Sequence, residues 1–335
     1  MEPRGLLRGK AALITGGEGS IGMATARAFV AEGARVCLVG LVADELRDGA
    51  QALGAAATWT VADVTDSAAV KTAVAGAAEA FGGLHVVVSN AGIAGVIAPV
   101  ADYPEDVFDQ VMAVHVRGSF LVCKHSLPFL ESGSSIVITS SVVGLTSAPG
   151  ICAYATAKHA LVGLMRTLAK ETAPRGIRVN TIHPGPVDNE FQHRIEVAAT
   201  GAERDRAASI FEGFIPLARH ATPDEVARAM LFLASDQSSF VTGATLASTA
   251  ACPAEPPGRR AAISPPADYF HCNCGQGSRG YPRRPRPPRA GSAPIPGEIR
   301  PQRASAPHQP DGSLPSIYTD RRYMSQGRLT RCLRR

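Results

Sequence analysis

Residues 11–22 are Ala-Ala-Leu-Ile-Thr-Gly-Gly-Glu-Gly-Ser-Ile-Gly. The first five predict a short apolar strand, and the glycine-rich run leads into an alanine-rich helical pattern that extends to Glu32. A second predicted strand, residues 35–39, comes soon after Gly33. This order of strand, glycine turn, helix and strand predicts a βαβ unit that binds a nucleotide, because the turn admits a pyrophosphate and the helix N-terminus attracts its charge.

The alternation of strands and helices continues along the chain. Such alternation is typical of an α/β fold with a doubly wound parallel sheet, flanked by helices and joined by right-handed crossovers. The segment 190–215 lacks the pattern and mixes charge with phenylalanine, which indicates either a mobile substrate lid at about residues 188–216 or a solvated pair of surface helices. Further strands are predicted at 57–62, 85–88, 135–139, 176–182 and 241–246, and further helices at 44–53, 67–81, 105–129, 154–171 and 223–234.

Tyr154 and Lys158 stand four residues apart at the start of a predicted helix, so both side chains emerge from one face. A phenol ordinarily has a pKa of about 10, and a cation beside it favours the phenolate, which brings proton transfer within reach near neutrality. Ser141 follows the apolar run 136–139 and could hydrogen-bond the oxygen on which the phenol acts. These three residues are predicted to form a catalytic group.

Polar residues follow several of the predicted strands. Asp63-Val64 comes after the strand at 57–62, and Asn90-Ala91-Gly92 comes after the strand at 85–88. Ligands in such folds bind beyond the carboxyl ends of the strands, so both groups are candidate binding residues, although the Asn90 triplet alone fits a simple turn equally well. A stiff Pro184-Gly185-Pro186 run ends a later strand.

Dinucleotide-binding proteins often place an acid at the end of the second strand, where it binds the adenosine ribose. Gly40-Leu41 stands there in this chain, so no carboxylate is in place for the 2′-hydroxyl. No arginine follows directly to bind a 2′-phosphate, and Glu18 in the glycine turn would repel one. The sequence therefore favours NAD(H) over NADP(H).

The 335 residues are 45% apolar, enough for a large core. No apolar run reaches the length of about 18 residues that a membrane helix needs. The first ten residues are too polar for a signal peptide, so we expect a cytoplasmic protein without membrane contact. Cys37, Cys123 and Cys152 lie singly in or beside apolar segments, which predicts core thiols and no disulfide scaffold.

The net charge of the chain changes sign at about residue 248. The first 247 residues contain 19 basic and 24 acidic residues, a net charge of −5, whereas the remainder has 15 arginines, no lysine and five acids, a net charge of +10. The tail 248–335 also has 15 prolines, a composition that predicts disorder. An arginine-rich arm at 283–289 could attract nucleic acid, and His271, Cys272 and Cys274 could hold a metal. We expect neither, because aromatic interleaving and a second ligand pair are both missing.

These motifs together resemble the short-chain dehydrogenase/reductase family, in type, order and spacing over residues 6–246. The resemblance implies a single-domain Rossmann-type fold at residues 1–247. It also implies that Tyr154 is the general acid/base, that Lys158 lowers its pKa and binds the nicotinamide ribose, and that Ser141 orients the substrate oxygen. The implied cofactor site consists of Gly16, Ser20, Ile21, Gly22, Asp63, Val64, Asn90, Ala91, Gly92, Tyr154, Lys158, Pro184, Gly185, Val187 and Asn189.

The chain departs from the family pattern at two site positions. His115 stands where the family has an asparagine that helps to hold a proton relay through water from the lysine. The imidazole could hold a similar water, titrate into the relay, or be a satisfied core residue, and we include it among the candidate catalytic residues. Asn189 replaces the threonine that binds the nicotinamide carboxamide, and its amide can still hydrogen-bond there.

A third departure is the C-terminus. The family ends its last strand with an Asp-Gly-Gly turn, whereas this chain continues to Arg335. Legitimate codons for residues 247–253 give Val-Asp-Gly-Gly-Met-Pro in a shifted frame, so our hypothesis is that the tail arose from a frame change. The family's C-terminal segment commonly packs at a subunit interface, so the tail could perturb the homo-oligomer, a dimer or tetramer, that the resemblance implies.

The sequence therefore predicts an NAD(P)-dependent oxidoreductase that moves a hydride between a nicotinamide and a secondary alcohol or ketone. The expected partner is an uncharged small molecule, and no metal site is predicted. The alternative is a catalytically silent dinucleotide-binding protein, a sensor or scaffold on the same fold. The intact Ser141, Tyr154 and Lys158 argue against it, because a binding module has no need of a tuned phenol.

Overall fold

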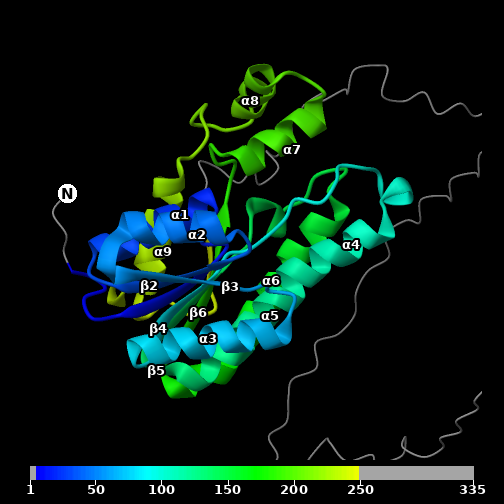
Figure 1. The fold of residues 1–335 in the computed structure, drawn as a ribbon. Coiled ribbons are helices and arrows are strands. Elements are labelled where there is room, and N and C mark those ends of the chain that lie inside the picture. Colours follow the sequence, from blue (N-terminus) through cyan, green and yellow to red (C-terminus); the bar gives the residue numbers. More distant parts are fainter. Residues whose placement is uncertain (1–4, 249–335) are drawn as a thin grey trace, which may run out of the picture. The chain divides into compact units, whose positions relative to one another are not determined.

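The computed structural model describes residues 5–248, which form one parallel sheet with helices on both faces (Figure 1). The strands are β1 (Ala11–Thr15), β2 (Arg35–Gly40), β3 (Ala57–Val61), β4 (Leu84–Ser89), β5 (Leu130–Thr139), β6 (Arg178–Pro184) and β7 (Thr245–Ser248). They lie in the order β3-β2-β1-β4-β5-β6-β7, and every neighbouring pair is parallel. Because β1 lies between β2 and β4, the chain winds outward from β1 in both directions, and the predicted doubly wound fold is confirmed.

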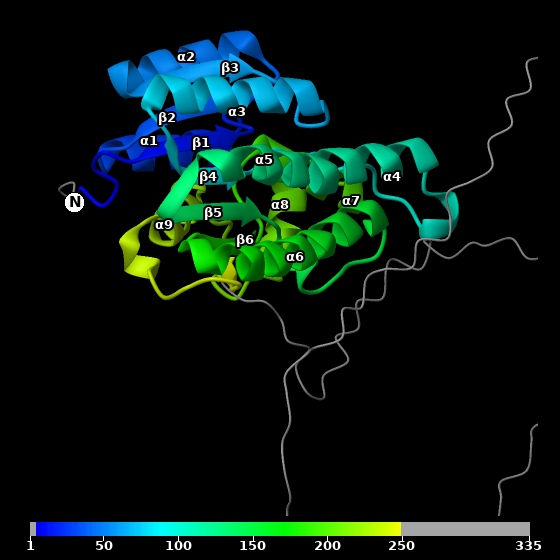
Figure 2. The same ribbon diagram turned by 90° about the horizontal axis from the view of Figure 1, so that it is seen from below.

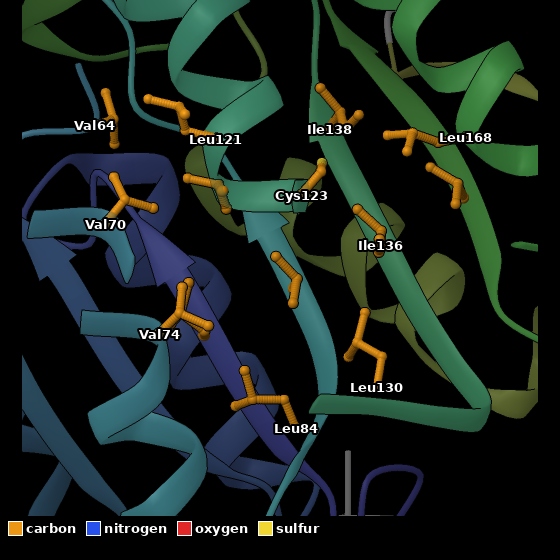
Figure 3. Close-up of a cluster of buried hydrophobic side chains, with 14 of the residues drawn as sticks. Val64, Val70, Val74, Leu84, Leu121, Cys123, Leu130, Ile136, Ile138 and Leu168 are labelled. Carbon is orange, nitrogen blue, oxygen red and sulfur yellow. The ribbon is translucent and has the colours of Figure 1, made fainter. Parts of the chain in front are cut away.

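Helices cover both faces of the sheet (Figure 2). They are α1 (Ser20–Ala31), α2 (Ala43–Leu53), α3 (Ser67–Phe81), α4 (Glu105–Met112), α5 (Gly118–Ser126), α6 (Cys152–Thr172), α7 (Glu190–Thr200), α8 (Arg204–Glu212) and α9 (Pro223–Ala234). On one face, Phe29 of α1 and Met230 of α9 share a buried apolar cluster with the sheet. On the other face, Val74 of α3, Leu121 of α5 and Met165 of α6 belong to a second cluster, part of which is drawn in Figure 3.

The central strands are buried on both sides, which explains their continuous apolar sequences. In β1, Leu13 joins the cluster under α3, α5 and α6, whereas Ile14 joins the cluster under α1 and α9. Successive side chains of a strand point to opposite faces, so a strand covered on both faces needs an apolar residue at every position. Cys37 and Cys123 are buried in the core as free thiols, as predicted, and Cys152 is a partly exposed free thiol.

The helix predicted at 105–129 is interrupted. Two α-helical segments, α4 and α5, are joined by a π-helical segment, Ala113–Arg117, and α5 ends in a 3-10 turn, Leu127–Phe129. A π-helical segment widens the helix locally and occurs frequently at functional sites. Here it carries His115, which is buried.

Several predicted strand boundaries also differ from the structure: β5 begins five residues before the predicted strand 135–139, and β6 lies two residues beyond the predicted strand 176–182. The strand predicted at 241–246 begins only at Thr245, two residues after Gly243, which has a φ of 73°. It also extends to Ser248, which pairs with Pro184 although the sequence assigns residue 248 to the tail. The segment at 188–216 forms the helix pair α7 and α8.

The predictions for the tail concern residues outside the described range. They include its disorder, its origin in a frame change, the basic arm at 283–289 and the histidine and cysteines at 271–274. Within residues 5–248, no helix combines the length and the apolarity that a membrane crossing requires.

Candidate active site

The predicted site residues gather around a cavity of about 370 Å³ at the carboxyl ends of β1 to β6. The glycine turn after β1 forms one wall, and the start of α7 forms another. Every candidate catalytic and cofactor residue lines this cavity except Gly22, which packs beneath the glycine turn. The lining also includes residues that the sequence did not single out as site residues, among them Glu18, Ile93, Thr139, Ser140, Phe191 and Gln192.

The glycine turn fits a pyrophosphate. Gly16 has a φ of 61°, which favours glycine, and a Cβ added to Gly22 would lie 2.1 Å from the carbonyl oxygen of Gly16. This close packing starts α1 directly under the turn. Gly19 caps α1 without a side-chain hydrogen bond, so the first N–H groups of the helix are available to an anion.

Asn90 joins the ends of three strands. Its backbone N–H donates to the Thr15 hydroxyl at 2.9 Å, and its side-chain Nδ2 donates to the carbonyl oxygens of Thr15 and Gly16 at 3.2 and 3.3 Å. The Thr139 hydroxyl donates to Asn90 Oδ1 at 3.2 Å. These bonds use the Asn90 side chain to fix the cavity floor between β1, β4 and β5, so the Asn90 triplet is more than a simple turn.

Close packing brings Ser141 to the N-terminal part of α6. The Ser140 hydroxyl donates to the carbonyl oxygen of Lys158 at 2.9 Å, and a Cβ on Gly144 would lie 2.8 Å from that same oxygen. The turn that carries Ser141 is therefore pressed against the helix that carries Tyr154 and Lys158. Lys158 Nζ lies 5.3 Å from the centroid of the Tyr154 ring.

Burial governs the protonation of this group. Lys158 is 3% exposed and donates to the carbonyl oxygen of Thr139 at 2.8 Å, and burial lowers its pKa to about 7. Burial raises the pKa of Tyr154 to about 12, an effect that the neighbouring Ser141 hydroxyl opposes. The sequence predicts a lowered pKa for Tyr154, but in this structure desolvation raises that pKa and outweighs the hydrogen bond from Ser141. At neutral pH the phenol therefore carries its proton.

His115 faces the cavity as a neutral imidazole. Its Nε2 lies 2.7 Å from the Ile93 carbonyl oxygen and 3.1 Å from the Ile93 backbone nitrogen, and its Nδ1 is buried with no hydrogen-bond partner in residues 5–248. Burial, followed by the charge of Lys158, lowers the pKa of His115 to about 3. Gly92 makes room for the ring, because a Cβ there would lie 2.3 Å from His115 Cε1.

His183, to which sequence reasoning assigned no role, contacts the backbone of Ser141. Its Nδ1 lies 2.8 Å from the Ser141 carbonyl oxygen, and its Nε2 lies 2.8 Å from the Thr181 hydroxyl. Burial lowers the pKa of His183, so the ring is neutral and links the Ser141 turn to β6. A histidine at the end of an apolar strand was the available signal in the sequence.

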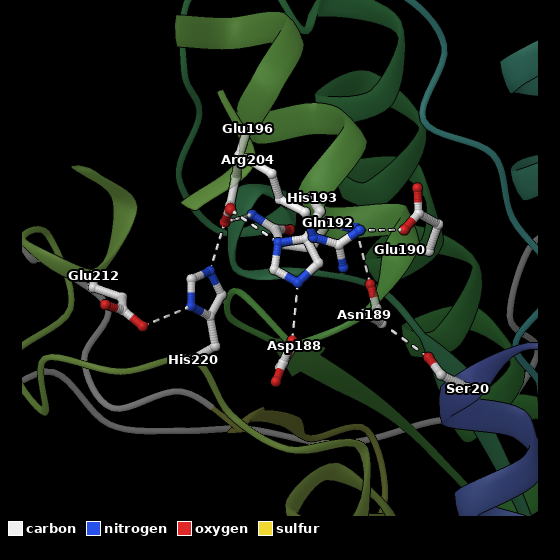
Figure 4. Close-up of polar contacts among 10 residues, drawn as sticks. All are labelled: Ser20, Asp188, Asn189, Glu190, Gln192, His193, Glu196, Arg204, Glu212 and His220. Atoms are coloured by element: carbon white, nitrogen blue, oxygen red, sulfur yellow. Dashed lines mark hydrogen bonds and ion pairs between the residues drawn. The ribbon is translucent and has the colours of Figure 1, made fainter. Parts of the chain in front are cut away.

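The start of α7 closes one side of the cavity. Asn189 Oδ1 accepts from the backbone N–H of Gln192 at 2.8 Å and so caps the helix, while its Nδ2 donates to the Ser20 hydroxyl at 3.0 Å (Figure 4). The Phe191 ring follows directly and lies 6.3 Å from the Tyr154 ring, centroid to centroid. Asn189 therefore connects the α7 wall to the glycine turn.

An acid–histidine cluster of Asp188, His193, Glu196, Glu212 and His220 holds α7 and α8 to the following segment (Figure 4). The Glu196 side chain is fully buried, and its Oε1 lies 2.6 Å from His220 Nε2. Burial lowers the pKa of His220, but the carboxylates of Glu196 and Glu212 outweigh it and raise the pKa overall. Residues 5–248 hold no group of histidines, cysteines and acids arranged to bind a metal ion.

Comparison with known proteins identifies the family to which this chain belongs. A family model described as Enoyl-(Acyl carrier protein) reductase matches residues 16–249. The 2-(S)-hydroxypropyl-CoM dehydrogenase 3 of Xanthobacter autotrophicus is 37% identical over 246 residues, which cover 72% of this chain and 95% of that protein. The chain belongs to the short-chain dehydrogenase/reductase family. It is therefore an oxidoreductase of the class that acts on CH–OH groups with NAD(P).

A solved structure and a second curated relative are also similar to this dehydrogenase/reductase. The crystal structure of an NAD⁺-bound xylitol dehydrogenase superposes with a TM-score of 0.70 at 32% identity, covering 73% of this chain and 99% of that one. The inactive 2-(S)-hydroxypropyl-CoM dehydrogenase 2 of Xanthobacter autotrophicus is 39% identical over 230 residues, 66% of this chain and 96% of that protein. The curated relatives are thus matched almost over their full lengths.

Proposed function

We propose that the protein transfers a hydride between C4 of a nicotinamide and the carbon of an uncharged secondary alcohol or ketone. The observation that carries the proposal is the convergence of Ser141, Tyr154 and Lys158 on one cavity with the glycine turn. The turn offers a cradle for a pyrophosphate, and the catalytic group lines the same cavity. The bound dinucleotide would accept or supply the hydride.

In the reductive direction, Tyr154 donates its phenolic proton to the substrate oxygen, and in the oxidative direction the phenolate takes the proton back. The Ser141 hydroxyl holds that oxygen by a hydrogen bond. The protonated fraction of Lys158, whose pKa is about 7, stabilises the phenolate through its charge at 5.3 Å from the ring. The unpartnered His115 Nδ1 would bind a water in a proton relay behind the phenol, as donor or acceptor according to the tautomer.

The cavity walls favour a substrate without charge. Ile93, Val187 and Phe191 line the cavity together with the phenol, and among the described lining residues Lys158 is the one cation. That cation already donates to the Thr139 carbonyl oxygen. An anionic substrate would lose its hydration here without gaining a partner.

We further propose NAD(H) as the preferred cofactor, supported by the carboxylates of Glu18 and Asp63 in the cavity lining. The homo-oligomer, the cytoplasmic location and the role of 188–216 as a substrate lid stay predictions.

The decisive experiment is a comparison of initial rates with NADH and NADPH over a panel of uncharged ketones, and with NAD⁺ and NADP⁺ over the matching alcohols. Turnover that is lost in Tyr154→Phe, while cofactor binding persists, supports the proposal. The alternative is a silent dinucleotide-binding protein, favoured by the histidine at 115 and by the resemblance to a relative described as inactive. NADH binding without turnover on any member of the panel would support that alternative.

A further inference from the structure

The side chain of Glu18 extends from the glycine turn towards the end of β2. The backbone N–H of Gly17 donates to the carbonyl oxygen of Val39 at 3.1 Å, so the turn is held against the end of that strand. Glu18 Oε1 then accepts from the backbone N–H of Leu41 at 2.8 Å, directly beyond the strand. The carboxylate therefore lies at the carboxyl end of β2 although the sequence carries no acid there.

Gly40 leaves the space that this carboxylate occupies. A Cβ built on Gly40, the last residue of β2, would lie 1.9 Å from Glu18 Oε2 and 2.3 Å from its Cδ. Any side chain at residue 40 would therefore displace Glu18. The glycine and the glutamate act as a pair, in which the turn supplies the acid and the strand leaves room for it.

The second carboxylate oxygen lacks a partner. Glu18 Oε2 is buried and accepts no hydrogen bond from residues 5–248, although Glu18, Gly40, Leu41 and Asp63 all line the cavity. A buried acceptor without a donor costs free energy, which a ligand hydroxyl at this place would recover. On α2, the first helix after β2, the guanidinium of Arg47 is paired with Asp44 and Asp48.

We propose that Glu18 accepts a hydrogen bond from the adenosine ribose 2′-hydroxyl and thereby selects NAD(H) over NADP(H). The inference rests on the proposed function, since it concerns the cofactor of that reaction. The carboxylate of Glu18 replaces the acid that dinucleotide-binding proteins often carry at the end of the second strand. It also repels a 2′-phosphate, because the other charged lining residues in the described part of the chain are Asp63, an acid, and Lys158, which already donates to the Thr139 carbonyl oxygen.

The test measures cofactor binding rather than turnover. Dissociation constants of NADH and NADPH are determined from cofactor fluorescence for the wild type, Glu18→Ala, Glu18→Gln and the double variant Glu18→Ala/Gly40→Asp. Loss of a charged hydrogen bond predicts that Glu18→Ala weakens NADH binding by about tenfold and narrows the preference over NADPH. Glu18→Gln keeps the size of the side chain and should bind NADPH better than the wild type.

The double variant separates a specific role from a disturbed turn. With Glu18 removed, an aspartate at residue 40 has the space and returns a carboxylate to the end of β2, so preference for NADH should recover. Gly40→Asp alone places two carboxylates in one space and should weaken both cofactors. Thermal unfolding of each variant checks that the fold is intact.

Two results would overturn the inference, and they differ in what they say of the proposed function. If Glu18→Ala and Glu18→Gln discriminate between NADH and NADPH as the wild type does, Glu18 does not select the cofactor while the proposed function stands. If the folded wild type binds neither dinucleotide, both fail.

Discussion

His115 and Tyr154 meet edge to face, with ring centroids 5.4 Å apart and ring planes at 85°. Burial holds the imidazole neutral, and Lys158 Nζ lies 5.3 Å from the centroid of the same phenol ring. A protonated His115 would place a second cation in this buried space. His115 therefore makes the stability of the fold depend on pH, even though its imidazole is neutral in the folded protein at neutral pH.

This arrangement predicts an acid-labile fold. The pKa of His115 is about 3 in the folded protein and about 6.5 in the unfolded chain, so only the unfolded chain gains a proton as the pH falls from 6.5 towards 3. Stability is therefore lost in that window, by about 2 kcal/mol at pH 5. Denaturant unfolding of the wild type and of His115→Asn at pH 7 and pH 5 checks this, since the asparagine cannot titrate.

His183 titrates in the same direction and is present in both proteins, so the comparison isolates residue 115. The loss between pH 7 and pH 5 should be smaller in His115→Asn, whatever the stability of the two proteins at pH 7. Equal losses would show that the histidine does not stay neutral in the fold.

The phenol of Tyr154 gives a second prediction. Tyr154→Phe keeps the ring that packs near His115 and Phe191 but removes the proton donor, so kcat/KM should fall by about 10²- to 10⁴-fold. NADH binding and the unfolding temperature should change little. Tyr103→Phe is a matched control, because its hydroxyl accepts from Val96 in a loop before α4 and does not line the cavity. Comparable losses in both variants would argue against a specific role.

The glycine turn gives a third prediction, on stability. In Gly22→Ala the new methyl group would lie 2.1 Å from a backbone oxygen that cannot turn aside, and such overpacking costs about 2 kcal/mol or more. Gly76 in α3 is the matched control, because a Cβ there meets nothing within 4 Å. Gly76→Ala should stabilise the protein by about 0.5–1 kcal/mol through helix propensity. In denaturant unfolding, the free energy of unfolding should fall in Gly22→Ala and rise in Gly76→Ala. A Gly22→Ala variant as stable as the wild type would contradict the packing argument.

Local sequence determined what could be predicted about the fold and the cavity. The glycine turn, the Asn90 triplet and the four-residue spacing of Tyr154 and Lys158 each depend on a few neighbouring residues and on the strand or helix that contains them. Parallel strands bring their carboxyl ends to one edge, so these motifs converge without further information. The structure brings all of them to the cavity lining.

Contacts between distant segments could not be predicted. Glu18 reaches Leu41 because the turn docks on β2, which no spacing within the turn indicates. His183 supports Ser141 across 42 residues. The π-helical segment at His115 interrupts a sequence whose apolar periodicity continues through it, and burial of Tyr154 reverses a pKa shift that was predicted from one neighbouring charge.

The acid–histidine cluster gives the last prediction, on the α7–α8 wall. Glu196 is fully buried and accepts from Gln192 Nε2 at 2.9 Å as well as contacting His220. Glu196→Gln removes one of the two carboxylates that raise the pKa of His220, so that pKa should fall and the contact of His220 with α7 should weaken. Hydrogen exchange at residues 190–212 should then speed up by about tenfold or more, because breaking a buried charge pair is costly.

The pH dependence of the same exchange has a definite sign. A raised pKa for His220 means that its stabilising contribution is complete below pH 6.5 and is lost as the pH rises through the folded value. In the wild type, exchange of α7 and α8, corrected for the intrinsic rate, should therefore accelerate towards alkaline pH, and in Glu196→Gln this dependence should flatten. Glu203→Gln, an exposed acid at the start of α8, serves as the control and should behave as the wild type. Unchanged exchange in Glu196→Gln would mean that apolar packing, rather than this cluster, holds α7 against the cavity.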